Sequence, residues 1–164
     1  MNIFRFVFIL SFFVSFSAHA QTYFGISLGK SDDLFLESES TLELYGGVRL
    51  TPNFAIELSH IDLGEYRDQN EIVESISGFQ YSLVGFMPLS EDVDLYAKVG
   101  RLNWESELIE DGISNTVEDD NMTYSLGASF DVAEGFQANI EYRTIEIESE
   151  REPNILSLGF SFSF

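Results

Sequence analysis

In several segments of this sequence, apolar residues alternate with small or polar ones. The charged residues of these segments come in equal numbers of each sign, although the chain as a whole is strongly acidic. Its 164 residues include 28 Asp and Glu against 8 Lys and Arg, a formal net charge of −20. On the small or polar face of these segments, three acids and three bases cancel in net charge: Glu43, Glu57, Glu141, Arg49, Lys98 and Arg143. Charges enclosed in a narrow interior must be paired, because desolvating a lone ion is costly. These six are candidates for interior ion pairs, the alternative being solvated strand charges that balance by chance.

Nucleophilic catalysis is a second chemistry that the residue types could support. His60 is the only histidine after residue 20, and it lies beside Ser59 and near Asp62. Catalysis by a hydroxyl needs a base within hydrogen-bond reach and a further group that orients the base. Neighbouring residues of a strand point to opposite faces, so Ser59 and His60 would not meet. We therefore expect no catalytic residues, and an interface histidine is the alternative interpretation of His60.

Cation binding by the many acids is a third possibility. Four polar stretches, at about 31–40, 62–74, 105–121 and 147–153, together with Glu146, hold 20 of the 28 acids. Divalent cations favour such carboxylates, but Glu118-Asp119-Asp120 lacks the spaced ligands and the glycine of a calcium loop. We expect diffuse divalent cations here, and neither a defined metal site nor a cofactor. The same acidity disfavours nucleic acid as a partner.

The elements that must position these residues are strands. Apolar residues alternate with small or polar ones in eight segments, 23–29, 41–50, 54–60, 76–87, 93–103, 122–130, 136–143 and 155–164. Short connections near 51–53, 88–92 and 132–135 alternate with the four long acidic stretches. Short turns at one end and long loops at the other are typical of a transmembrane barrel. The pattern predicts an all-β fold, an eight-stranded antiparallel up-and-down transmembrane β-barrel.

The composition of the second face decides which side of the barrel meets lipid. A soluble barrel such as a lipocalin would cover its outside with Lys, Glu, Asp, Gln and Thr. Here the second face is rich in Gly and Ser, which suit a narrow interior, and the other face is aliphatic and aromatic, as lipid requires. Arg101 falls on the lipid side and is expected near the headgroups. Aromatics near strand ends, among them Tyr23 and Trp104, are expected in interfacial girdles or, alternatively, in the core.

The first twenty residues predict export. Arg5 precedes an apolar run over 6–16, and Ala18-His19-Ala20 places small residues at the positions that signal peptidase requires. An N-terminal membrane anchor is the alternative, but a spanning helix needs about 20 apolar residues. We expect residues 1–20 to be a cleaved signal peptide and 21–164 to form the barrel domain.

Residues 21–164 resemble the small eight-stranded outer-membrane barrels of Gram-negative bacteria, the OmpA-like transmembrane domain and its OmpX-like relatives. The resemblance rests on the signal ending 18–20, the opening 23–29, the strand 96–100 and a last strand that closes on Phe164. In the family, a terminal aromatic after alternating apolar residues is read by the barrel-assembly machinery, and Leu158, Phe160, Phe162 and Phe164 match that signal. The resemblance implies the transmembrane domain only, without the peptidoglycan-binding domain of full-length OmpA proteins.

These observations predict a small integral protein of the cell outer membrane, exported by the secretory pathway, with both barrel termini periplasmic. We expect a monomer with a structural or surface-interaction role through acidic extracellular loops and an interior plugged by ion pairs. Its expected partners are outer-membrane lipid, lipopolysaccharide and the barrel-assembly machinery, and the chain is not expected to be an enzyme. A narrow porin-like channel and, less favoured, a lipid-A-modifying barrel enzyme are the alternatives.

Overall fold

Eight strands account for most of the chain. The computed structural model describes residues 21–32, 40–67, 73–110, 113–146 and 153–164. Their strands are β1 (Gln21–Asp32), β2 (Ser40–Thr51), β3 (Phe54–Arg67), β4 (Val73–Pro88), β5 (Val93–Glu110), β6 (Ile113–Ala133), β7 (Phe136–Glu146) and β8 (Asn154–Ser163). Among these residues, no helix is long and apolar enough to cross a membrane. The expected signal peptide, 1–20, lies outside the described residues and stays a prediction.

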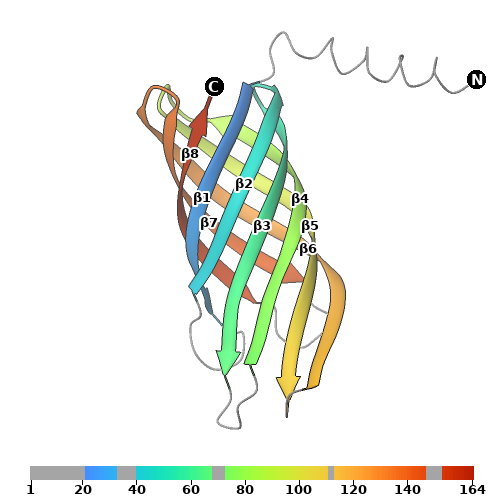
Figure 1. The fold of residues 1–164 in the computed structure, drawn as a ribbon. Helices are drawn as coiled ribbons and strands as arrows, with labels where there is room; N and C mark the ends of the chain where they lie inside the picture. The colour runs from blue at the N-terminus through green and yellow to red at the C-terminus, as the bar shows by residue number, and fades with distance from the viewer. Residues whose placement is uncertain (1–20, 33–39, 68–72, 111–112, 147–152) are drawn as a thin grey trace, which may run out of the picture.

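The strands close into one barrel (Figure 1). Each strand pairs antiparallel with the next along the chain, and β1 also pairs with β8, for example at Ile26 and Phe160. Over the part of the wall that all eight strands share, closure leaves no unpaired edge among the described residues, which is the requirement that a sheet must meet to sit in lipid. The predicted eight-stranded up-and-down barrel is confirmed.

Alternation along the strands gives the barrel an apolar outside and a small, polar inside. Leu126 on β6 has 68% of its surface exposed, whereas its neighbour Ser125 is buried. On β8, Leu158 and Phe160 are exposed while Ser157 and Ser161 are buried. An apolar belt of this kind is unfavourable in water and suits the hydrocarbon of a bilayer. The apolar face therefore points outward and the face of small and polar residues points inward, as the composition of the two faces predicted.

The two ends of the barrel differ. At one end, which we call the turn end, short connections at 52–53, 89–92 and 134–135 join β2 to β3, β4 to β5 and β6 to β7. Gly135 takes a positive φ of 72° in the last of these turns, a conformation that glycine adopts without strain. The start of β1 and the end of β8 lie at the same end (Figure 1). The opposite end, the loop end, carries the connections from β1 to β2, β3 to β4, β5 to β6 and β7 to β8.

The predicted loop 105–121 is wrong, because most of it is strand. β5 and β6 stay paired as far as Glu110 and Ile113, so only 111–112 fall outside the strands. Part of the predicted loop 62–74 likewise belongs to β3 and β4. Polar pairs such as Glu105 opposite Glu118 show no apolar face, which is why alternation did not reveal these strand ends. The two hairpins extend the wall beyond β1 and β2 at the loop end (Figure 1).

Candidate functional site

The barrel interior holds a cation between two carboxylates. Lys98 of β5 points inward, and its Nζ lies 2.6 Å from Glu57 Oε1 of β3 and 2.9 Å from Glu141 Oε2 of β7. All three side chains are buried. Because β3 and β7 lie on opposite sides of β5 along the wall, the lysine ties separate parts of the barrel together across its interior.

A second buried cation continues this arrangement. Arg143 Nη2 lies 2.7 Å from Glu43 Oε2 and 2.7 Å from Glu141 Oε1. Glu141 thus bridges Lys98 and Arg143, and the five residues form a continuous series that we call the ion-pair chain: Glu57, Lys98, Glu141, Arg143 and Glu43. With three carboxylates and two cations, the ion-pair chain has a formal charge of −1. Buried ions require this mutual pairing, since removing one partner leaves an uncompensated charge.

Tyrosine side chains supply further hydrogen bonds to the ion-pair chain. Tyr23 donates from its hydroxyl to Glu57 Oε2 at 2.9 Å, and Tyr96 donates to Glu141 Oε2 at 3.2 Å. Of the two placements expected for Tyr23, an interfacial girdle or the core, the structure shows the core. Its ring shares the inward face with Gly25, a parity visible in the sequence. The hydroxyls help to satisfy the carboxylate lone pairs that the two cations leave free.

Arg49, the sixth predicted interior charge, stands apart from the ion-pair chain. Its Nη2 lies 2.9 Å from Asp94 Oδ2, and its guanidinium sits 3.9 Å from the centre of the Phe86 ring. Both charged side chains are partly exposed, at 20% and 17%. Asp94, at the start of β5, is therefore the partner of Arg49 near the turn end.

An apolar cluster fills the interior toward the loop end, and the sequence analysis missed it. It consists of the buried residues Ile61, Leu63, Leu102, Ile145 and Ile155, which we call the apolar plug. These residues come from β3, β5, β7 and β8, so their contacts cross the interior rather than follow one wall. Trp104 packs against the plug and donates from Nε1 to Asn121 Oδ1 at 2.6 Å, so of its two expected placements, a girdle or the core, the structure shows the core.

The histidine lies apart from the interior. His60 is exposed on the outer face, where its ring centre lies 4.8 Å from that of Phe79 with the two rings tilted by 36°, and its Nδ1 lies 3.1 Å from Gly78 O. Ser59 is buried on the inner face at 3% exposure. The two side chains therefore lie on opposite sides of the wall.

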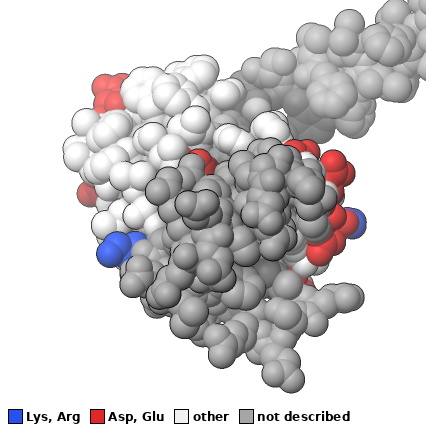
Figure 2. All heavy atoms as spheres, turned by 60° about the horizontal axis from the view of Figure 1, so that its bottom comes forward, with Lys and Arg blue, Asp and Glu red and all other residues white. Residues whose placement is uncertain are grey.

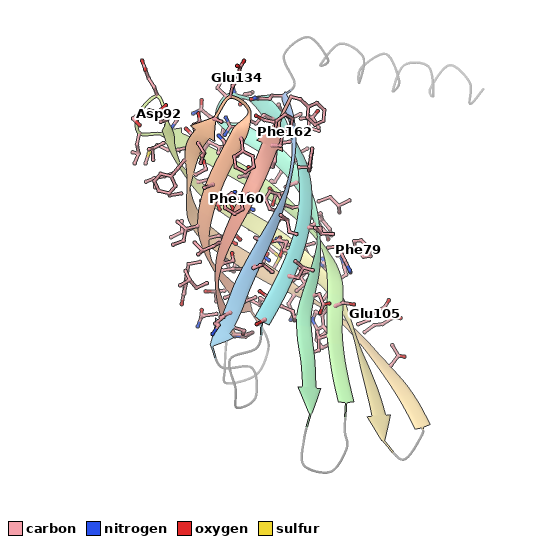
Figure 3. The ribbon with its side chains drawn as sticks, turned by 60° about the vertical axis from the view of Figure 1, so that its left-hand side comes forward. Phe79, Asp92, Glu105, Glu134, Phe160 and Phe162 are labelled. Carbon is pink, nitrogen blue, oxygen red and sulfur yellow. The ribbon has the colours of Figure 1, made fainter. Side chains whose placement is uncertain are left out.

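The residues of the expected assembly signal line the outside of the last strand. Leu158, Phe160, Phe162 and Phe164 are all exposed, and Figure 3 shows Phe160 and Phe162 along β8. Phe24 of β1 contacts this row, with its ring centre 6.0 Å from that of Phe162. The aromatic row thus covers the seam at which the first and last strands close the barrel.

The outer wall near the loop end is acidic. Exposed carboxylates there include Asp62, Glu105, Glu118 and Glu146, and Figure 2 shows acidic side chains gathered at this end. The outward-facing Arg101 forms an ion pair with Asp120. Among the described residues, no three His, Asp or Glu side chains are placed to hold a metal ion.

Comparisons with known proteins agree with this architecture. Neisserial surface protein A has a TM-score of 0.70 at 12% identity, covering 88% of this chain and 97% of its own. Ail, the attachment invasion locus protein of Yersinia pestis, gives 0.65 at 13%, covering 88% and 97%, in a complex with the heparin analogue sucrose octasulfate. The N-terminal β-barrel domain of Pseudomonas aeruginosa OprF gives 0.64 at 15%, covering 89% and 100%.

Structural similarity at such low sequence identities establishes only the fold. Membership of a protein family is established by a family model that matches the sequence. The comparison with curated proteins finds no match. A family model described as the outer membrane protein beta-barrel domain matches residues 6–164. The chain therefore belongs to the outer membrane protein beta-barrel family and is a protein of the outer membrane.

Proposed function

We propose that this protein is a closed outer-membrane barrel with a structural or surface-interaction role and no catalytic activity. The observation that carries the proposal is the filled interior. The ion-pair chain crosses the barrel at Lys98, and the apolar plug around Leu102 crosses it again nearer the loop end. Two successive layers of buried side chains would stop solutes, so the chemistry available to other molecules lies on the outside.

The exposed acids of the loop end are the part of the protein that would meet other molecules. The carboxylates of Glu105 and Glu118 lie on directly paired positions of β5 and β6, and both are exposed. Like charges on facing positions repel one another, and divalent cations relieve such repulsion. We infer a diffuse Mg²⁺ or Ca²⁺ layer through which the wall meets lipopolysaccharide phosphates. A polyanion of the kind bound to Ail would be repelled without such cations.

Electrophoretic mobility tests the acidic surface. Cells that display the protein should move faster toward the anode than cells that display Glu105→Gln/Glu118→Gln, and added Mg²⁺ should narrow the difference. The matched control is Glu91→Gln/Asp92→Asn, which removes two exposed acids from the turn end. Equal mobilities for the loop-end variant and the unchanged protein would contradict a surface role for these acids.

The proposed orientation places the turn end and both termini in the periplasm. The chain has no cysteine, so single cysteines can report on each end without background. Figure 3 shows Glu134 at the turn end and Glu105 on the side of the wall, nearer the loop end. A membrane-impermeant maleimide should label Glu105→Cys on intact cells and Glu134→Cys only after lysis. The reverse labelling pattern would show that the barrel has the opposite orientation.

Mass spectrometry of the same preparations should show the loss of residues 1–20, the expected signal peptide.

A narrow channel is the second candidate, and the hollow turn end favours it. A cavity of about 520 Å³ reaches from the turn end to Lys98, so only the part of the interior between Lys98 and the loop end would have to open.

A lipid-A-modifying enzyme is less favoured, because His60 and Ser59 point to opposite sides of the wall. Lipid A with an unchanged mass spectrum in His60→Ala cells, compared with cells that make the parent protein, is the expected result.

A further inference from the structure

The hairpin of β5 and β6 has a free backbone edge. β6 begins at Ile113, but its pairing with β7 begins only at Met122. Residues 113–120, which we call the β6 edge, therefore pair with β5 alone among the residues that the structure describes. The chain returns quickly from β7 to β8, where Ile145 N donates to Pro153 O at 3.1 Å. The link between these two strands is too short to follow β6 for more than about three residues.

Every second residue of the β6 edge turns its backbone toward the open side. In an antiparallel sheet, the N–H and C=O of one residue face one neighbouring strand, and those of the next residue face the other. Asp131 N donates to Asp92 O at 2.9 Å, which directs the odd-numbered residues of β6 toward β5. The register of β5 and β6 continues from there without a shift. The residues whose backbone groups face away from β5 are Ser114, Thr116, Glu118 and Asp120.

The backbone of Asp120 shows that this side is open. Its N–H donates to Oδ1 of Asp119 at 2.8 Å, a side chain of the same strand, and not to a neighbouring strand. Unpaired N–H and C=O groups along a strand are a template for pairing with another chain. Recognition by an added strand takes its affinity from these main-chain groups and its specificity from the side chains beside them.

The side chains beside the β6 edge are acidic and lie outside the hydrocarbon of the membrane. Glu118 and Asp119 are exposed, and Glu118 lies directly opposite the exposed Glu105 of β5. Carboxylates on the outer wall are unfavourable in lipid, and β5 and β6 extend past the ends of β1 and β2 (Figure 1). Like charges on facing positions repel, so a second copy of this edge is a poor partner. A basic strand is the complementary one.

We propose that the β6 edge binds a basic peptide segment as an added β-strand. The backbone of the peptide pairs with the outward N–H and C=O groups of Thr116 and Glu118, and its Lys or Arg side chains on the outer face lie beside Glu118 and Glu105. The inference deepens the proposed surface role, on which it rests. That role needs only the exposed acids, whereas edge pairing also needs an extended partner with free amides.

Titration of a fluorescent peptide with the folded full chain in zwitterionic lipid nanodiscs tests the proposal. The probe is a capped peptide of alternating Lys and Val, and its control carries N-methyl groups on two successive central amides. Successive amides point to opposite edges of a strand, so the control keeps the charge but loses pairing along both edges. Saturable binding is expected for the probe at low ionic strength. The control should bind at least about tenfold more weakly, because backbone hydrogen bonds are lost.

A pair of variants at one residue separates the backbone from the side chain. Thr116→Pro removes an N–H from the open side, a change that an edge strand tolerates, and should weaken probe binding about threefold to tenfold. Thr116→Val keeps the backbone and the branched shape, and it should bind the probe as the parent does. Glu105→Gln/Glu118→Gln should weaken the binding of the probe and of the N-methylated control by the same factor.

Amide hydrogen exchange locates the bound peptide. With the probe bound, the amides of Thr116 and Glu118 should exchange at least about tenfold more slowly, whereas the amide of Val117, which already faces β5, should change less. Absence of saturable binding would overturn the proposal, and so would unchanged exchange at Thr116 and Glu118. Equal affinities for the probe and its N-methylated control would also overturn edge pairing, while leaving the acidic surface role intact.

Discussion

Removal of Lys98 should destabilise the barrel far more than removal of a comparable exposed cation. In Lys98→Met the side chain keeps a similar length but loses the charge that contacts Glu57 and Glu141. Glu141 would retain Arg143 as its partner. Glu57 would keep only the hydroxyl of Tyr23, so one carboxylate would remain in the interior without a cation.

The size of the effect follows from that single orphaned charge. Breaking a buried pair by removing one partner costs about 3–5 kcal/mol. The formal charge of the ion-pair chain would change from −1 to −2, because three carboxylates would face Arg143 alone. The double variant Lys98→Met/Glu57→Gln removes the orphaned charge, so it should recover more than half of the lost stability. Recovery of this kind measures the coupling between the two residues.

Urea unfolding in lipid vesicles is the assay, and the protein carries its own probe. Trp104 is the only tryptophan of the sequence, and it packs against the apolar plug. Its fluorescence should therefore report the loss of the folded interior. Arg101→Met is the matched control, because the ion pair of Arg101 with Asp120 is exposed on the outer face and should contribute about 1 kcal/mol or less. Equal losses for Lys98→Met and Arg101→Met would refute the interpretation of the ion-pair chain as a structural closure.

Three further tests, two of them with a control variant, address other parts of the structure. Gly25→Ala should lower the free energy of unfolding by about 1–3 kcal/mol, because the added Cβ would meet Phe160 O at 2.6 Å and the ring of Tyr45. Gly46→Ala should lower it little in the same assay, because the nearest atom to its Cβ lies at 3.6 Å. Leu102→Ala should cost about 2–5 kcal/mol because it opens a cavity in the apolar plug, whereas Leu126→Ala faces lipid, opens no enclosed cavity and should cost only the lost transfer of its side chain from water to lipid, about 2 kcal/mol or less. Phe164→Ser should lower the yield of folded barrel in the outer membrane, judged by heat-modifiable migration on gels, while detergent refolding of the purified chain stays unchanged; an unchanged yield in cells would remove Phe164 from the assembly signal.

Strand parity was enough to predict which charges face inward, but it could not predict their partners. The inward positions of Glu57, Lys98 and Glu141 follow from period two alone. Their contacts depend on how neighbouring strands are staggered around the closed barrel, which a single sequence does not specify. That is why Arg49 was grouped with the other interior charges although it pairs with Asp94 near the turn end.

The limits of the pattern also explain the missed apolar plug. The predicted strand ends at residue 60, so Ile61 lies beyond it and Leu63 falls within the predicted acidic loop 62–74. Strand pairing continues past that point through backbone hydrogen bonds, which do not require an apolar outer face. The inward parity of Leu102 and Ile145 was already available in the sequence. What the sequence lacked was the closure that brings β3, β5, β7 and β8 together across the interior.

Ion conductance across planar bilayers tests most directly whether the interior is closed. Purified protein that has inserted, judged by heat-modifiable migration, should give no steady open current at moderate voltage. Lys98→Gly/Leu102→Gly/Ile145→Gly removes side chains from both the ion-pair chain and the apolar plug, and its current should exceed that of the parent, which shows that the assay detects an opened interior. A steady, ohmic conductance from the unchanged protein in most insertions would contradict the closed barrel and favour the channel.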